Sequence, residues 1–332
     1  MSRLFRRRPP AGLAAIVGLG LLAAGCSTGG GSSANPGPLE KANLNVTAVP
    51  SVDSAALYIA ADRGLFAAEG LHVTILKTQT EASAIASQLE GQFDVTAGPY
   101  VSYIRKNALD PKANFRVLAP GSTMQANNEQ ILVPKGSRIS TVGALSHASV
   151  AVDGDQAFKD DNTIGTLLVK SVLTDNGVNL ANVNFVPMQF SQLPTALADG
   201  QVSAAWMPEP YVSEAEQKSG AVPLADPNQG HSQTLPISGY MVTASWLAKY
   251  PHTAAAFRAA IIKAQAIAAT DPGAVQQGLQ KFAGASQQTA AIASDPEFPT
   301  QQSAAALGRL AGLMLNFGML PQAYSVNKMI VK

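Results

Sequence analysis

The chain contains 332 residues, 46% of them hydrophobic and 14% charged, with a formal net charge of +1 at pH 7. That hydrophobic content is ample for a globular core, and the length favours two lobes over one. No basic stretch beyond the N-terminus indicates a nucleic-acid partner. No second apolar run of about 18 residues indicates a membrane span.

The N-terminus has the pattern of an export signal. Four arginines within the first eight residues precede an apolar stretch over residues 11–24. That stretch is shorter than the roughly 20 residues that cross a bilayer, and a charged head before a short apolar run is typical of a secretory signal. Residues 22–26 read Leu-Ala-Ala-Gly-Cys, which resembles a bacterial lipobox. The consecutive arginines at 6–8 leave the twin-arginine route open beside the general secretory route.

Cys26 is the chain's one cysteine, so it has no partner for an internal disulfide. We expect residues 1–25 to be a lipoprotein signal peptide and Cys26 to carry the lipid. Because one acyl chain holds a protein only marginally, stable anchoring at the outer face of the cell membrane needs a multiply acylated cysteine. Residues 26–42, with several Gly, Ser and Pro, are expected to form a flexible tether. An ordinary secreted protein with a stray cysteine is the alternative. Loss of the four signal arginines leaves 19 basic and 22 acidic residues, a net charge of −3.

Strands and helices alternate after the tether. Strand patterns cover residues 44–49, 71–76 and 93–97. Between them lie helical patterns: one that Ser54 can cap and Gly64 ends, and others over residues 65–69 and 81–90. A strand-helix series of this kind implies a mostly parallel sheet with right-handed crossovers.

The alternation then starts again and ends in a helical tail. Further strands are predicted at 115–119, 130–133, 148–152, 183–187, 202–206 and 239–244. Helices are predicted at 141–145, 163–176, 193–199 and 211–218, and in the tail at 246–250, 254–270, 274–282 and 301–317. The chain therefore reads as an α/β protein of two successive three-layer units.

Several passages, in order, resemble one known family, the substrate-binding proteins of ABC importers for nitrate, sulfonates, taurine and thiamine-pyrimidine precursors. The passages are LYIAADRGLFAAEGLHV at 57–73, LEGQFDV at 89–95, ALADGQVSAAW at 196–206, EPY at 209–211, GYMV at 239–242 and YP at 250–251. They extend over nearly all of residues 43–270. Ser203 departs from the family, which usually has an aspartate there.

The resemblance implies a two-lobed periplasmic-binding-protein type II fold, with mixed, mostly parallel sheets flanked by helices and a hinge of two crossing strands. Lobe I would comprise residues 43–132 plus 237–332, and lobe II residues 133–236. A small ligand would close the lobes by hinge motion, and the permease subunits of an ABC importer would read the closed state. We expect a monomer without a cofactor or metal.

In such sheets ligands bind beyond the carboxyl ends of the strands, where helix N-termini point their free N–H groups. The first unit offers three candidates there. Ser54 either donates to a ligand or only caps its helix. Gly98 permits close backbone approach, and Tyr100 offers a ring and a hydroxyl. A core tyrosine with a satisfied hydroxyl is the other reading of Tyr100.

The second unit offers four more candidates. Asn162 or Thr163, at the start of a long helix, would suit an anionic oxygen, although both residue types are also favoured as plain caps. Trp206 would wall the cleft. Glu209 would take a cationic or amide group, which favours a zwitterion, amine or nitrogen heterocycle over a bare anion, unless it is a solvated surface acid.

Two other functions stay open on the sequence. An enzyme of this fold is one, because pyrimidine synthases resemble the same family. Against it, the four histidines are scattered, no cluster has metal-ligand spacing, and no nucleophile elbow or phosphate loop is present. The other is a lipoprotein that presents its ligand to a membrane sensor. We expect no enzymatic activity.

Overall fold

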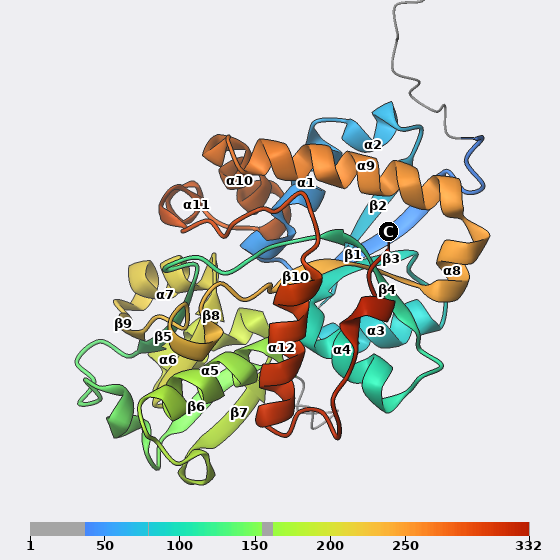
Figure 1. Cartoon of the computed structure of the whole chain (residues 1–332). Helices are drawn as coiled ribbons and strands as arrows, with labels where there is room; N and C mark the ends of the chain where they lie inside the picture. Colours follow the sequence, from blue (N-terminus) through green and yellow to red (C-terminus); the bar gives the residue numbers. More distant parts are fainter. Residues whose placement is uncertain (1–36, 79, 155–161, 332) are drawn as a thin grey trace, which may run out of the picture. The chain divides into compact units, whose positions relative to one another are not determined.

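The computed structural model describes residues 37–78, 80–154 and 162–331. The predicted signal peptide, Cys26 and most of the predicted tether lie outside these residues. The described part of the chain folds into two five-stranded sheets with helices packed on them (Figure 1). Among these residues no helix is both long and apolar enough to cross a membrane.

The first sheet has the strand order β2-β1-β3-β10-β4. Its strands are β1 (Asn43–Ala48), β2 (His72–Lys77), β3 (Val95–Pro99), β4 (Phe115–Pro120) and β10 (Ser238–Thr243). β1 runs parallel to β2 and β3, whereas β10 is antiparallel to β3 and β4. Every residue of the inner strand β3 is buried, as expected for a strand covered on both faces.

The second sheet repeats this arrangement with the order β7-β6-β8-β5-β9. Its strands are β5 (Glu129–Val133), β6 (Ser149–Asp153), β7 (Asn184–Met188), β8 (Ala204–Pro208) and β9 (Val222–Ala225). β6 runs parallel to β7 and β8, and β5 is antiparallel to β8 and β9. Each sheet thus has a parallel part and one strand of opposite direction inside it.

The helices follow the strands along the chain. Those before β10 are α1 (Ala55–Asp62), α2 (Leu65–Ala68), α3 (Glu81–Leu89), α4 (Tyr100–Leu109), α5 (Ile164–Asp175), α6 (Leu193–Ala198) and α7 (Tyr211–Ser219). After β10 come α8 (Ala244–Lys249), α9 (Pro251–Ala268), α10 (Pro272–Gly278), α11 (Gln287–Ile292) and α12 (Ala304–Asn316). Short 3-10 turns precede α1 (Val52–Ser54) and α6 (Phe190–Gln192).

Two crossing segments join the sheets, between β4 and β5 and between β9 and β10, as the predicted hinge requires. They bond to each other, since the Met124 amide donates to the Leu235 carbonyl at 2.9 Å. The predicted lobe boundary between residues 132 and 133 falls inside β5. All of β5 pairs in the second sheet, so residues 129–132 lie with the second lobe and not with the first.

Two hydrophobic cores lie on opposite faces of the first sheet. Neighbouring residues of β4 point to different cores: Leu118 packs with α1, α9 and α10, whereas Val117 packs with α4 and α12. The second of these cores continues into the second lobe through Ile131, Leu168 and Trp206. The first lobe is therefore packed against the second through α4 and α12.

The C-terminal residues return to the first sheet. The amide of Val117 donates to the carbonyl of Met329 at 2.7 Å, and the amide of Val331 donates to the carbonyl of Val117 at 3.2 Å. β4 is the last strand of its sheet. The end of the described chain thus covers part of the edge of β4.

Candidate functional site

The strand ends of both sheets meet at one place. β1 and β3 of the first sheet and β6 and β8 of the second have their carboxyl ends there. The antiparallel strands contribute their first residues instead: Ser238 of β10 stands opposite Pro99, and Glu129 of β5 stands opposite Pro208. This is the edge at which open α/β sheets bind ligands.

A small cavity of about 20 Å³, here called the inner cavity, lies between these strand ends. Residues of both sheets line it: Val49, Ser51, Asp53, Ser54, Glu81, Ala97, Gly98, Pro99, Glu129, Ile164, Phe190, Trp206, Pro208 and Ile237. Its volume is far below the 300–1,000 Å³ of usual ligand pockets. The two lobes are in contact at this place, where the Val52 amide donates to the Glu209 carbonyl.

A larger cavity of about 660 Å³, here called the outer cavity, adjoins the first. Helices α3 and α4 line one side, and Asp153, Gly154, Asn162 and Thr163 line the other. Glu81 and Phe190 line both cavities, so they stand between the two. The outer cavity has the size of a small-molecule pocket.

Asp53 joins the inner cavity to the crossing segments. Its carboxylate accepts hydrogen bonds from the hydroxyls of Ser122 (2.5 Å) and Ser51 (3.1 Å), and the Ser122 and Ser238 hydroxyls lie 2.9 Å apart. Ser122 belongs to the first crossing segment and Ser238 opens β10 directly after the second. Burial between the lobes raises the pKa of Asp53, against the effect of the two hydroxyls.

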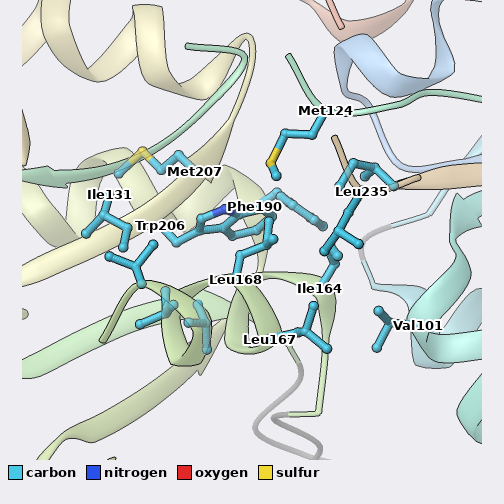
Figure 2. Packing of buried hydrophobic residues seen from close by; sticks show 14 of the residues in the cluster. Val101, Met124, Ile131, Ile164, Leu167, Leu168, Phe190, Trp206, Met207 and Leu235 are labelled. Atoms are coloured by element: carbon cyan, nitrogen blue, oxygen red, sulfur yellow. The ribbon is translucent and has the colours of Figure 1, made fainter. Parts of the chain in front are cut away.

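Glu129 and Trp206 form the wall on the side of the second lobe. Both are buried, and the indole Nε1 donates to Glu129 Oε2 at 3.2 Å. The ring of Phe190 lies 6.1 Å from that of Trp206, centroid to centroid, and Figure 2 shows the two rings among Ile164, Leu168 and Met207. Burial, together with the nearby charges of Asp53 and Asp153, raises the pKa of Glu129 well above its usual value.

Asp153 is the last residue of β6, and its side chain is hydrogen-bonded to the start of α5. Its Oδ1 accepts hydrogen bonds from the Thr163 hydroxyl (2.8 Å) and the Gly165 amide (2.9 Å). The Glu81 carboxyl, at the start of α3 in the first lobe, lies beside Asp153 and lowers its pKa, but burial outweighs this effect and raises the pKa of Asp153 to about 6.

Three of the seven predicted ligand-binding residues line the inner cavity: Ser54, Gly98 and Trp206. Ser54 does not cap α1 with its side chain; its hydroxyl donates to the Val49 carbonyl at 3.3 Å. Asn162 and Thr163 line the outer cavity. Thr163 is the N-cap of α5 and accepts from the Thr166 amide at 3.4 Å, so its oxygen already serves the helix.

Tyr100 and Glu209 lie outside the residues that line either cavity. The Tyr100 ring packs against Gly239, and its hydroxyl donates to Gln302 Oε1 at 2.6 Å, as in the alternative reading of a core tyrosine. Glu209 is buried and accepts from the Ser213 amide, the Ser213 hydroxyl and the Ser294 amide. Burial raises its pKa to about 7. The contacts of Glu209 are thus with its own chain.

Sequence reasoning missed Asp53, Glu81, Glu129 and Asp153. A signal existed for two of them: Asp53 follows β1 and Asp153 ends β6, the positions where ligand contacts are expected. No group of three or more His, Cys, Asp or Glu in the described part of the chain could hold a metal ion. What the arrangement offers is a set of buried carboxylates and aromatic rings between two lobes.

Three kinds of comparison place this architecture among known proteins. The family model described as NMT1/THI5 like matches residues 51–275. No curated protein sequence matches the chain. Among solved structures, the alkanesulfonate-binding protein SsuA from Xanthomonas axonopodis pv. citri, bound to MOPS, is 17% identical, with a TM-score of 0.72 over 89% of this chain and 99% of that one.

Two further structures are similar to the same degree. A ligand-binding component of an ABC-type import system from Staphylococcus aureus, with zinc bound, is 12% identical, with a TM-score of 0.73 over 88% of this chain and 97% of that one. The desulfurization enzyme DSZB is 16% identical, with a TM-score of 0.67 over 88% and 96%.

The predicted fold is confirmed: the two sheets with their flanking helices form the type II periplasmic-binding-protein fold. The family match extends from Ser51, beside the inner cavity, through both crossing segments to α10. The chain belongs to the NMT1/THI5-like family.

Proposed function

We propose that this protein is an extracytoplasmic solute-binding lipoprotein of an ABC importer. It captures a small molecule between its two lobes and hands it to the permease subunits. The lipidated Cys26 holds it at the outer face of the cell membrane. The sequence resemblance allows a sulfonate, nitrate or taurine-like ligand or a thiamine-pyrimidine-like one.

One observation carries the proposal: the inner cavity is enclosed by strand ends from both lobes. Contacts across the lobes surround it, including the Val52 amide, which donates to the Glu209 carbonyl at 3.0 Å. A site enclosed in this way takes up its ligand only if the lobes part. The two crossing segments allow such a hinge motion, and a closed state that depends on ligand is a signal that a permease can read.

The proteins of similar structure support this role. One is a ligand-binding component of an ABC-type import system and another is an alkanesulfonate-binding protein. A third is an enzyme, so the fold alone does not exclude catalysis. In the described part of the chain, neither His nor Cys lines either cavity. Carboxylates and aromatic rings in a closed cleft fit capture of a ligand better than nucleophilic chemistry.

Ligand screening, followed by a test of whether each bound compound is recovered unchanged, separates binding from catalysis. The full-length chain in mild detergent is unfolded thermally in the presence of sulfonates, nitrate, amino acids, amines and pyrimidines. A specific ligand at 100 times its Kd adds about 2.7 kcal/mol, which raises the midpoint by roughly 5 °C or more. Each hit is then incubated for hours and recovered. Unchanged compound supports a binding protein, whereas conversion with turnover contradicts it.

The permease partner is tested separately. Detergent-solubilised membranes of the source cell are passed over the tagged protein with and without the hit ligand. We expect retention of importer subunits in the presence of ligand. Retention of a membrane sensor protein in their place would support the alternative role of presenting the ligand to a receptor.

A further inference from the structure

The charge of the inner cavity is unusual for a site that takes anions. Asp53, Glu81 and Glu129 line it, and no Lys, Arg or His is among the described residues that do so. Asp153 and Glu81 both line the adjoining outer cavity. Three carboxyl groups, from both lobes, thus line the inner cavity.

One carboxyl oxygen of Glu129 has no hydrogen-bond donor within the protein. The residue is fully buried, with an exposed fraction of 0%, and only Oε2 has a donor, the Trp206 indole. Oε1 is buried and has no hydrogen-bond partner. Buried polar atoms are nearly always paired, because an unmet hydrogen bond in a low-dielectric interior is costly. An N–H donor on a ligand in the cavity would meet this need.

Aromatic rings complete the wall. Trp206 and Phe190 both line the inner cavity, and the face of an aromatic ring attracts a cation electrostatically. Carboxylates that accept N–H bonds beside ring faces are complementary to an organic cation. A sulfonate or nitrate offers no N–H donor to the unpaired Glu129 oxygen.

We propose that the ligand is a small organic cation with N–H donors, carrying an ammonium or amidinium group that bonds Glu129 and faces Asp53. This inference rests on the proposed function and names the class of solute for the same site. Because the closed cavity holds only about 20 Å³, the lobes part to admit the ligand and close around its charged group.

Matched probes of opposite charge test the inference. Binding of ethylammonium, benzamidinium and 4-aminopyridinium to the full-length chain is compared with binding of methanesulfonate, benzenesulfonate and nitrate, by calorimetry and thermal unfolding at pH 7.5. Glu129→Gln removes the group that can ionise against a cation but keeps the shape, and we expect it to weaken the best cation about tenfold or more. Asp199→Asn, an exposed acid at the end of α6, is the matched control and leaves the affinity unchanged. Asp53→Asn is the second variant if Glu129→Gln does not fold.

The outcomes separate the two proposals. Tighter binding of an anion than of every cation, or a cation affinity that neither Glu129→Gln nor Asp53→Asn lowers, overturns the ligand class and leaves the solute-binding role intact. Failure of all three cations to bind also overturns the ligand class. The solute-binding role is then decided by the wider screen and by the retention of importer subunits.

Discussion

Asp153 is a carboxylic acid held away from water at the end of β6, with a pKa of about 6. In the unfolded chain the same group titrates near 3.8. The folded state therefore holds the proton more tightly, and the stability that this provides below pH 4 is lost as the pH rises through about 6. A shift of this size corresponds to up to about 3 kcal/mol.

We expect Asp153→Asn to remove this loss. The free energy of unfolding of the variant, relative to that of the wild type, should rise by up to about 3 kcal/mol between pH 4 and pH 7.5. Urea unfolding at four pH values measures it, with Asp199→Asn as the control whose difference from wild type stays flat. A difference for Asp153→Asn that does not change with pH would contradict the prediction.

Substitution of Tyr100 tests whether this predicted ligand-binding residue belongs to the site or to the core. Its hydroxyl donates to Gln302 Oε1 at 2.6 Å and lines neither cavity. Tyr100→Phe should therefore lower the free energy of unfolding by about 1 kcal/mol, the net value of one buried hydrogen bond. Ligand affinity, measured by calorimetry with the best ligand of the screen, should not change. A clear fall in affinity would return Tyr100 to the site.

The sequence placed some residues at the cavity and could not place others. Ser54, Gly98 and Trp206 were predictable because they follow or end strands that run toward the site. Glu129 was not predictable as a site residue, because it is the first residue of an antiparallel strand. The rule that ligands bind at the carboxyl ends of parallel strands does not apply to such a residue. Glu209 was predicted as a ligand contact from its place after β8. Its side chain instead bonds Ser213, one helical turn on, and the distant Ser294, a contact that no local pattern reveals.

The first turn of α5 packs so closely on its neighbours that only glycine fits at position 165. A Cβ added to Gly165 would meet Asp153 Oδ1 and the Trp206 ring. Gly165→Ala should cost about 1–3 kcal/mol by overpacking, although alanine is the better helix former. Gly308 in α12, where nothing lies within 4 Å of an added Cβ, is the matched control.

Gly308→Ala should stabilise the protein by about 0.5–1 kcal/mol, because only the gain in helix propensity remains. Chemical unfolding of both variants measures the contrast. Equal effects of the two substitutions would show that the approach of α5 to β6 and β8 is looser than its geometry implies. If the contrast holds, Gly165→Ala should also weaken ligand binding, because it displaces Trp206.

Elements with a clear period were predicted within two or three residues, and those without one were missed. Strands 93–97 and 202–206 appear as β3 and β8, each two residues later. Helix α4 went unpredicted because its first turn, from Tyr100 to Ile104, is rich in aromatic and β-branched residues that favour strands. β9 also went unpredicted, because it has only four residues, one of them Pro223, and so shows no clear strand pattern.

At the scale of the whole molecule, the proposed lipid anchor at Cys26 would decide where the protein acts. Cys26→Ser should move the mature protein from the membrane fraction to the soluble extracytoplasmic fraction, because the signal then lacks the thiol that accepts the lipid. Cell fractionation and the mass of the N-terminal peptide measure this outcome. Ser27→Ala, the neighbouring substitution, is the control. A Cys26→Ser protein that stays with the membrane would contradict lipid anchoring.

The backbone pairing of Val117 with Met329 and Val331 has a practical consequence for engineering. An uncovered edge strand offers free amide and carbonyl groups to any other chain, and proteins that lose such a cover tend to aggregate. A fluorescent reporter joined rigidly to residue 331 would pull this segment off β4. A biosensor built from this protein therefore needs a flexible spacer after residue 331, or a reporter inserted elsewhere, to remain soluble.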